Sequence, residues 1–110
     1  MNLKEITEFQ RDFDRKRGWN QYEKCETPEQ ILDFMQHFVL VMVEELGEVA
    51  RVRKQILRDK KSLSVKGLKD EIVDLFVYLI QASIALDMNL EDEYMRKMKE
   101  SVQRFPARKS

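Results

Sequence analysis

Residues 38–48 read FVLVMVEELGE, and residues 71–80 read EIVDLFVYLI. Both stretches are strongly apolar, yet each carries carboxylates at helical spacing. Glu45 and Glu48 are three residues apart, as are Glu71 and Asp74, and Glu44 stands beside the first pair. A carboxylate in an apolar helix costs free energy unless a positive group or a hydrogen bond offsets its charge. The pattern therefore predicts two central helices whose acids are partnered, and a divalent cation is the simplest partner.

The length and composition set limits on the class of protein. A chain of 110 residues predicts one domain over residues 1–110. Charged residues make up 36% of the chain and balance to zero net charge, so we expect no nucleic acid polymer and no membrane among its partners. The chain has one cysteine, Cys25, and no signal-peptide or membrane-spanning run. These features predict a cytoplasmic protein.

Apolar periodicity predicts helices and no strand. An apolar stripe indicates a first helix over residues 3–16 that ends at Gly18. The members of this stripe are Leu3, Ile6, Phe9 and Phe13. Thr27 and Gln30 form the capping-box pattern of a second helix, which we expect to continue to about residue 57.

The second half of the chain predicts two further helices. Residues 59–67 are polar and basic, and Gly67 is expected to break the chain there, so this segment is predicted to be a loop. A third helix is expected over residues 68–87. Asn89 can cap a fourth helix, which Pro106 would stop. The apolar stripe of that last helix is Met95, Met98, Val102 and Phe105.

The two central helices are apolar nearly all round in their middles, and such helices need cover on several sides. Four helices from 110 residues provide little cover. We therefore expect an all-α, four-helix bundle-like fold whose core is completed by oligomerisation into a homodimer or homotetramer. The alternative is a tight monomeric four-helix bundle.

The acids can form a cation site if the two central helices pack antiparallel. At about 100° per residue, Glu45 and Glu48 lie about 60° apart around one helix, and the pair on the other helix repeats this relation. The short connection between the helices favours antiparallel neighbours, so the two pairs can face each other. Carboxylate oxygens suit Mg²⁺ or Mn²⁺, and Mg²⁺ often completes its shell with water and phosphate oxygens. The pattern therefore indicates phosphate chemistry.

Two other interpretations of the acids remain open. On a solvated helix face they would pair with basic neighbours such as Arg51, Lys54 or Lys69. A di-iron carboxylate bundle would need Glu-x-x-His on two helices, and the only histidine, His37, belongs to no such motif. The interpretation as a Mg²⁺ or Mn²⁺ site is favoured because both acidic clusters adjoin the most apolar runs of the chain.

The order of these acids resembles the EExxE…ExxD signature of the all-α nucleoside triphosphate pyrophosphohydrolases, the MazG-like superfamily. The resemblance covers roughly residues 13–106 and is nearest to the dCTP pyrophosphatase branch. Flanking segments that match are Arg17-Gly18-Trp19, Leu68-Lys69-Asp70-Glu71, Tyr78, Lys97-Met98 and Arg104-Phe105-Pro106. The resemblance implies a MazG-type fold and an enzyme that hydrolyses a nucleoside triphosphate to a monophosphate and diphosphate. It also implies use of Mg²⁺, with Mn²⁺ as a substitute, and a role in removing non-standard or excess nucleotides.

The resemblance also implies roles for individual residues. The metal ligands would be Glu45, Glu48, Glu71 and Asp74. Glu44 would act from outside the coordination shell or orient the attacking water. The candidate catalytic residues are therefore Glu44 together with two of the ligands, Glu45 and Glu48. The candidate substrate-binding residues are Trp19 and Tyr78 at the base, and Lys97 and Arg104 at the phosphates. Arg104 follows Lys97 by seven positions, so both lie on one helix face.

The chain departs from the family pattern at two places. Ser101 replaces an asparagine of the closing segment, and Gln55 stands near the place of a second tryptophan of the dCTP branch. Two alternative functions follow. One is a phosphoribosyl-ATP pyrophosphohydrolase of the same superfamily, which the region around Trp19 fits less well. The other is a non-catalytic helical interaction module, whose motivation is the apolar surface of the central helices.

Overall fold

The computed structural model describes residues 1–59 and 65–108, and the side chains of residues 1–51 and 67–108. Its described part contains four α-helices and one short 3₁₀ helix, with no strand, so the all-α prediction is confirmed. The elements in chain order are α1 (Leu3–Arg17), η1 (Gln21–Lys24), α2 (Pro28–Asp59), α3 (Val65–Ala85) and α4 (Leu90–Arg104). No helix among the described residues is both long and apolar enough to cross a membrane.

Local capping signals set the helix boundaries that the sequence predicts. Gly18 ends α1 with φ of 69°, a left-handed conformation in which glycine has no Cβ penalty. At the start of α2, the Gln30 backbone N–H donates to the Thr27 hydroxyl (3.2 Å), while the Gln30 side chain accepts from the Thr27 N–H (3.1 Å). Asn89 accepts from the Asp92 N–H at 3.1 Å and caps α4. These three predictions are confirmed.

One local expectation is wrong. Gly67 does not break the chain but lies within the first turn of α3, which begins at Val65 and ends at Ala85. The helix-forming tendency of the apolar residues that follow outweighs the cost of one glycine, about 0.5–1 kcal/mol. The connection between α1 and α2 contains the short helix η1 (Gln21–Lys24), which the apolar pattern did not indicate. The part of the expected loop at residues 60–64 lies outside the described residues.

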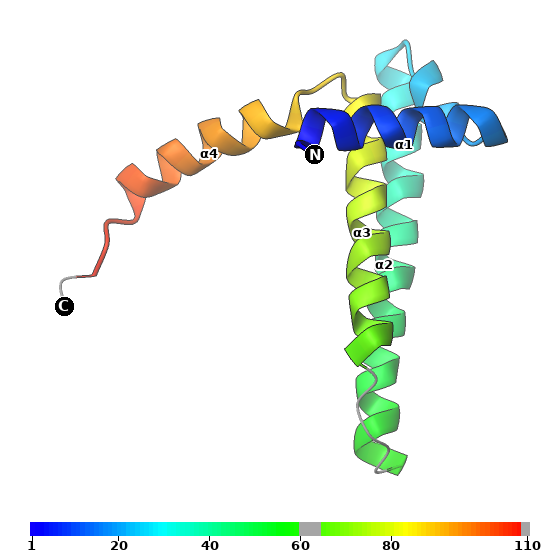
Figure 1. Ribbon diagram of the computed structural model, residues 1–110, viewed down its shortest axis with the longest axis vertical. Coiled ribbons are helices and arrows are strands. Elements are labelled where there is room, and N and C mark those ends of the chain that lie inside the picture. The colour runs from blue at the N-terminus through cyan, green and yellow to red at the C-terminus, as the bar shows by residue number, and fades with distance from the viewer. Residues whose placement is uncertain (60–64, 109–110) are drawn as a thin grey trace.

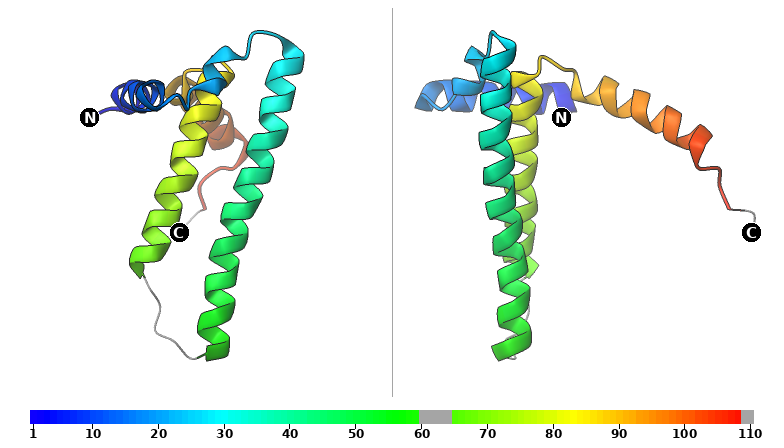
Figure 2. Two further views of the ribbon diagram at one scale, coloured as in Figure 1. Left: turned by 90° about the vertical axis from the view of Figure 1, so that its right-hand side faces the viewer. Right: turned by 180° about the vertical axis from the view of Figure 1, so that it is seen from behind.

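Four elements, α1, η1, α2 and α3, build the core around one end of an antiparallel helical hairpin. Helices α2 and α3 run side by side in opposite directions, and α1 crosses α3 near the C-terminal end of α3 (Figures 1 and 2). The buried apolar residues are Tyr22, Ile80, Ala82 and Ala85. The Tyr22 ring also meets the Phe34 ring of α2, with centroids 6.5 Å apart. Phe9, expected in the apolar stripe of α1, is exposed, and Gln10 and Asp14 occupy the buried face instead.

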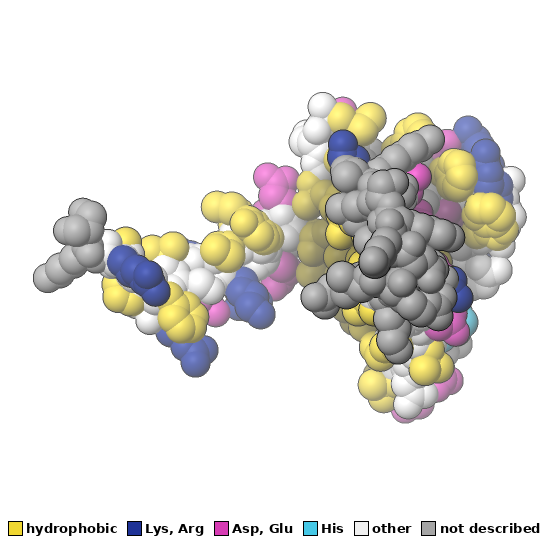
Figure 3. Space-filling view, turned by 90° about the horizontal axis from the view of Figure 1, so that it is seen from below, with side chains coloured by type: hydrophobic (Ala, Val, Ile, Leu, Met, Phe, Trp, Pro, Cys, Tyr) yellow, Lys and Arg dark blue, Asp and Glu magenta, His cyan; other side chains and the backbone are white. Residues whose placement is uncertain are grey.

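The fourth helix does not close a bundle within the chain. Helix α4 projects away from the α2–α3 hairpin, and hydrophobic side chains gather along it (Figures 1 and 3). The radius of gyration is 17.6 Å, against about 13 Å for a compact domain of about 100 residues. Apolar side chains remain exposed on α2, α3 and α4, among them Leu40, Val43, Leu46, Ile72, Val73 and Val102. A single copy of the chain is therefore not the tight monomeric bundle that we considered as an alternative.

Candidate functional site

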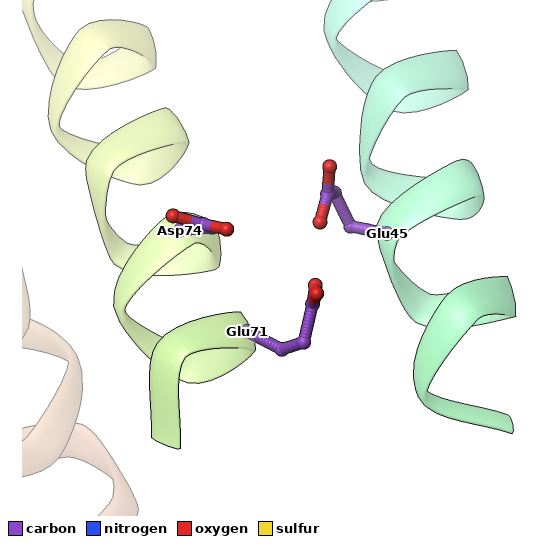
Figure 4. A group of neighbouring side chains, drawn as sticks. All are labelled: Glu45, Glu71 and Asp74. Carbon is purple, nitrogen blue, oxygen red and sulfur yellow. The ribbon is translucent and has the colours of Figure 1, made fainter. Parts of the chain in front are cut away.

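The antiparallel hairpin brings three of the predicted acids together. Glu45 extends from α2 toward Glu71 and Asp74, which lie one turn apart on α3 (Figure 4). Each residue offers one carboxylate oxygen, and these three atoms all lie within 4.8 Å of one another. Glu45 and Glu71 are half-buried, whereas Asp74 is exposed. The predicted facing of the two helices is therefore confirmed for these three residues.

Crowding of the three acids changes the titration of Glu45. The pKa of Glu45 is raised from 4.5 to about 7, first because its carboxyl hydrogen-bonds to Glu71, which favours the protonated form. Burial and the negative charges of Glu71, Glu48 and Asp74 raise it further. Glu71 Oε2 is buried and has no hydrogen-bond partner. The cluster thus holds negative charge that the described protein atoms do not neutralise.

This donor set fits a hard divalent cation. Mg²⁺, Mn²⁺ and Ca²⁺ all bind carboxylate oxygens, and a cation between three carboxylates would offset their repulsion and partner Glu71 Oε2. Glu48 and Glu44 are exposed and lie outside the group of three. Glu48 still contributes through its charge, since it helps to raise the pKa of Glu45.

A pocket of about 390 Å³ opens beside the acids, between α1 and α3. The residues that line it are Gln10, Phe13, Asp14, Trp19, Asp74, Val77, Tyr78 and Gln81. Asp74 belongs both to the acidic group and to the pocket wall. The two residues predicted at a base, Trp19 and Tyr78, line the same pocket. Its size is within the range of small-molecule sites, about 300–1,000 Å³.

The turn after α1 positions Trp19 at the pocket mouth. Because Gly18 is left-handed, the Trp19 backbone N–H turns back and donates to the Asp14 carbonyl at 2.9 Å. The indole then lies near the Phe13 ring, with centroids 6.1 Å apart, and remains 59% exposed. An aromatic face that is fixed by the backbone yet open to solvent can stack on a planar ligand.

Tyr78 connects the pocket to the acids. It is half-buried on α3, one turn after Asp74. Burial raises the pKa of its phenol, and the charges of Glu45 and Asp74 raise it further, followed by those of Glu44 and Glu48. Tyr78 therefore stays a neutral hydrogen-bond donor beside a cluster of negative charge.

The structure does not bring the predicted phosphate-binding residues to this site within one chain. Lys97 and Arg104 are exposed on α4, which projects away from the hairpin (Figure 1). The Arg104 guanidinium lies over the Phe105 ring, 5.2 Å from its centroid. The Ser101 hydroxyl donates to the Lys97 carbonyl at 3.0 Å, so it is used within α4. Lys54 and Gln55 lie outside the residues whose side chains are described.

Sequence reasoning missed a buried polar group at the base of the pocket. Asp14 is 1% exposed and accepts hydrogen bonds from Tyr22, Gln81 and Gln10. One signal was available, because Gln10 and Asp14 are spaced as i and i+4 on the face of α1 that also carries Ile6. Polar residues on the apolar face of a helix require partners.

Comparison with known proteins adds no assignment. No family model, no curated protein and no solved structure matches this chain.

Proposed function

We propose that this protein is a Mg²⁺-dependent nucleoside triphosphate pyrophosphohydrolase of the MazG-like kind, which converts a (d)NTP and water to a (d)NMP and diphosphate. The observation that carries the proposal is the adjacency of two features. A carboxylate group that fits a hard cation and an aromatic-lined pocket of about 390 Å³ share one residue, Asp74. A nucleotide needs both features side by side, because its base is planar and apolar-faced while its phosphates need a cation.

The division of tasks follows from the positions of the side chains. Glu45, Glu71 and Asp74 would hold Mg²⁺, with Glu48 as a further ligand. When bound, the cation neutralises phosphate charge and lowers the pKa of a water. Trp19 would stack on the base, and Tyr78 would donate a hydrogen bond to the sugar or the phosphates. Glu44, exposed beside Glu45, would orient the attacking water.

We further propose that a second copy of the chain supplies the phosphate-binding pair. Lys97 and Arg104 of the same chain lie on α4, which projects away from the α2–α3 hairpin (Figure 1). Pairing of two chains would cover the exposed apolar residues of the hairpin and of α4, such as Val43 and Val102. It would also allow α4 of one chain to reach the acids of its partner.

The test is release of diphosphate from a panel of canonical and modified nucleoside triphosphates with Mg²⁺. Wild-type protein should release diphosphate and monophosphate, whereas Glu48→Gln and Asp74→Asn should lose activity and remain helical by circular dichroism. A folded wild-type protein that hydrolyses no nucleotide in the panel contradicts the proposal. Full activity in both variants would contradict the metal assignment alone.

The exposed apolar surface also favours a second candidate, a non-catalytic helical module that associates through α2, α3 and α4. This candidate predicts self-association with no affinity for Mg²⁺ or Mn²⁺. Calorimetric titration of each ion into metal-free protein separates the two, since the enzyme proposal requires saturable heat that Glu71→Gln reduces.

A further inference from the structure

Helix α2 carries an apolar groove on the side that faces away from the acidic group. Glu45 points from α2 toward α3 (Figure 4), and Gln36 stands nine positions earlier, which places it on the opposite side of the helix at about 100° per residue. This surface, the α2 groove, has a volume of about 470 Å³. The residues that line it are Leu32, Met35, Gln36, Val39 and Leu40. The proposed function gives the α2 groove no role.

Negative charge borders the α2 groove. Residues 25–50 contain six acidic residues and no lysine or arginine. Glu29, Asp33 and Glu44 are exposed, and helical geometry places all three along one edge of the groove. None of these three acids forms an ion pair with another described residue. An occupant of the α2 groove should therefore be apolar on one face and positively charged beside it.

The projecting helix α4 has both properties. Its apolar face also forms a groove, of about 440 Å³, whose lining residues are Met95, Arg96, Met98, Lys99 and Val102. Residues 94–108 contain five basic residues and one acidic residue. Arg96 pairs with Glu93 and Glu100 within α4, whereas Lys99 has no ion-pair partner among the described residues. Positive charge therefore borders the apolar face of α4.

The two apolar faces match in length. The α2 groove extends from Leu32 to Leu40, and the exposed apolar residues of α4 extend from Tyr94 to Val102. Each span is eight positions, or about 12 Å along a helix axis. All four of these residues are at least 60% exposed in a single chain. Two helical faces of this kind pack with the side-chain ridges of one in the grooves of the other.

The two faces do not meet within one chain. Helix α4 projects away from the α2–α3 hairpin, and its main contacts are with α1 (Figure 1). No hydrogen bond or ion pair joins α4 to α2 among the described residues. A second copy of the chain would provide a face of the same length and opposite charge for both helices at once. An anionic lipid surface would suit α4 alone and would leave the α2 groove exposed.

We propose that the α2 groove is the docking site for α4 of a second copy of this chain, and that the two copies exchange their α4 helices reciprocally. In such a two-fold pair the contact forms twice, because each chain offers both faces. Lys97 and Arg104 lie about 120° around α4 from its apolar face, so they stay free to contact a ligand. The inference goes beyond the proposed function, because it holds for an enzyme and for a non-catalytic module alike.

The first test replaces one apolar residue on each face and measures self-association by sedimentation velocity. Leu40→Gln and Val102→Gln should each raise the dimer Kd at least about tenfold, since each change acts at both contacts of the pair. Both side chains are exposed in a single chain, so the monomer should keep its helices, which circular dichroism checks. Phe9→Gln makes the same kind of change at an exposed residue of α1 and should leave the Kd unchanged.

The second test exchanges charges between the two faces. Asp33→Lys gives a chain with two basic faces, and Lys99→Glu makes both faces acidic, so each variant alone should associate at least about threefold more weakly than wild type at low salt. In an equal mixture, every contact between unlike chains again joins opposite charges. The mixture should therefore associate about as tightly as wild type, and the differences should fade at high salt.

The third test locates the contact directly. Benzoylphenylalanine in place of Met98, in the middle of the apolar face of α4, cross-links to side chains near it on illumination. Unlabelled protein that carries this group is mixed with ¹⁵N-labelled wild-type protein before illumination. Mass spectrometry of the digest should find the cross-link in a labelled peptide from residues 28–46, which shows that the α2 groove belongs to the other copy.

The outcomes separate this inference from the proposed function. Several results would overturn the inference: a wild-type protein that stays monomeric at high micromolar concentration, an unchanged Kd in both glutamine variants, a mixture that associates no better than its components, or a cross-link to the same chain or to another helix. Association through these faces without hydrolysis of any triphosphate would uphold the inference and contradict the enzyme proposal. Hydrolysis by a monomeric protein would uphold the enzyme and contradict the inference.

Discussion

Replacement of Glu71 by glutamine should stabilise the metal-free protein. Glu45, Glu71 and Asp74 face one another with one oxygen each within 4.8 Å, and Glu71 Oε2 has no donor. In the Glu71→Gln variant, the new side-chain amide would carry no charge and would donate a hydrogen bond to the Glu45 carboxylate. A repulsive contact would thereby become an attractive one.

The size of the effect follows from the separation of the charges. Two unit charges 4.8 Å apart repel by about 0.9 kcal/mol in bulk water and by about 3.5 kcal/mol at an effective dielectric constant of 20. Because Asp74 is exposed and Glu45 only half-buried, the lower value applies to each pair. Removal of the Glu71 charge relieves two pairs, which gives a stabilisation of about 1–2 kcal/mol at low salt. For a domain of this size, that raises Tm by at least about 4 °C.

The effect should depend on pH in a defined direction. The pKa of Glu45 is raised from 4.5 to about 7 by its hydrogen bond to Glu71, by burial and by neighbouring charge. Between pH 4.5 and about pH 7, the folded state therefore keeps a proton on Glu45 that the unfolded state has released. The contribution of Glu45 to stability is therefore fully present below about pH 4.5 and is lost as the pH rises through about 7. The advantage of Glu71→Gln should be small at pH 5 and complete at pH 8.

The assay is thermal unfolding followed by circular dichroism. Measurements at pH 5 and pH 8 test the pH dependence, and measurements in EDTA and in millimolar Mg²⁺ test the effect of the cation. Glu44→Gln is the matched control, because Glu44 is exposed on α2 beside Glu45 but lies outside the group of three. Mg²⁺ should raise the Tm of wild-type protein more than that of Glu71→Gln, since the variant lacks one ligand. A lower Tm for Glu71→Gln than for wild type at pH 8 in EDTA would refute the reasoning, as would an equal response of both proteins to Mg²⁺.

Three further predictions concern other parts of the chain. Tyr22→Phe removes a donor from the buried Asp14 carboxylate and should lower the free energy of unfolding in urea by about 1–3 kcal/mol; an unchanged unfolding midpoint would show that this hydrogen bond adds nothing. Lys97→Ala and Asp74→Asn should each abolish hydrolysis. If Lys97 acts in the site of a partner chain, an equal mixture of the two variants should regain about a quarter of wild-type activity. If Lys97 acts in the site of its own chain, the mixture should stay inactive. Thr27→Ala removes the cap of α2 and should cost about 1 kcal/mol in the same urea assay, with Thr27→Ser near wild type.

The sequence predicted the helices well where short-range contacts decide them. Gly18, the Thr27 capping box and Asn89 each act within a few residues, and each lies where the pattern indicated. Helix η1 was missed because it depends on contacts with α1. The Arg15 guanidinium donates to Glu23 through Nε at 2.9 Å and through Nη2 at 2.7 Å. Such a pairing across eight residues leaves no periodic signal in the sequence.

In the candidate site, too, the sequence predicted the features that short-range spacing decides and missed those that depend on long-range contacts. The i, i+3 spacing of the acids predicted that they share helix faces, and the antiparallel hairpin brings Glu45, Glu71 and Asp74 together. Spacing alone could not indicate which acid of α2 lies nearest to the acids of α3, so it did not predict that Glu48 lies outside the group of three. The network around Asp14 joins α1, η1 and α3, and its longest link spans 67 residues, from Asp14 to Gln81. No local pattern carries a contact of that kind.

The position of the acids relative to the core would couple metal binding to the association of two chains, if the protein does both. The buried residues gather at the C-terminal end of α3, around Ile80 and Ala85, whereas Glu71 lies near its N-terminal end, beside the exposed Ile72 and Val73. If a second copy covers those apolar side chains, it also removes water from around the acids and strengthens every charge interaction among them. Without a cation, that change increases the repulsion and opposes association. With a cation, it increases the attraction and favours association. Because coupling between two binding equilibria is reciprocal, a cation that tightens the pairing of two chains must itself be bound more tightly by the paired state.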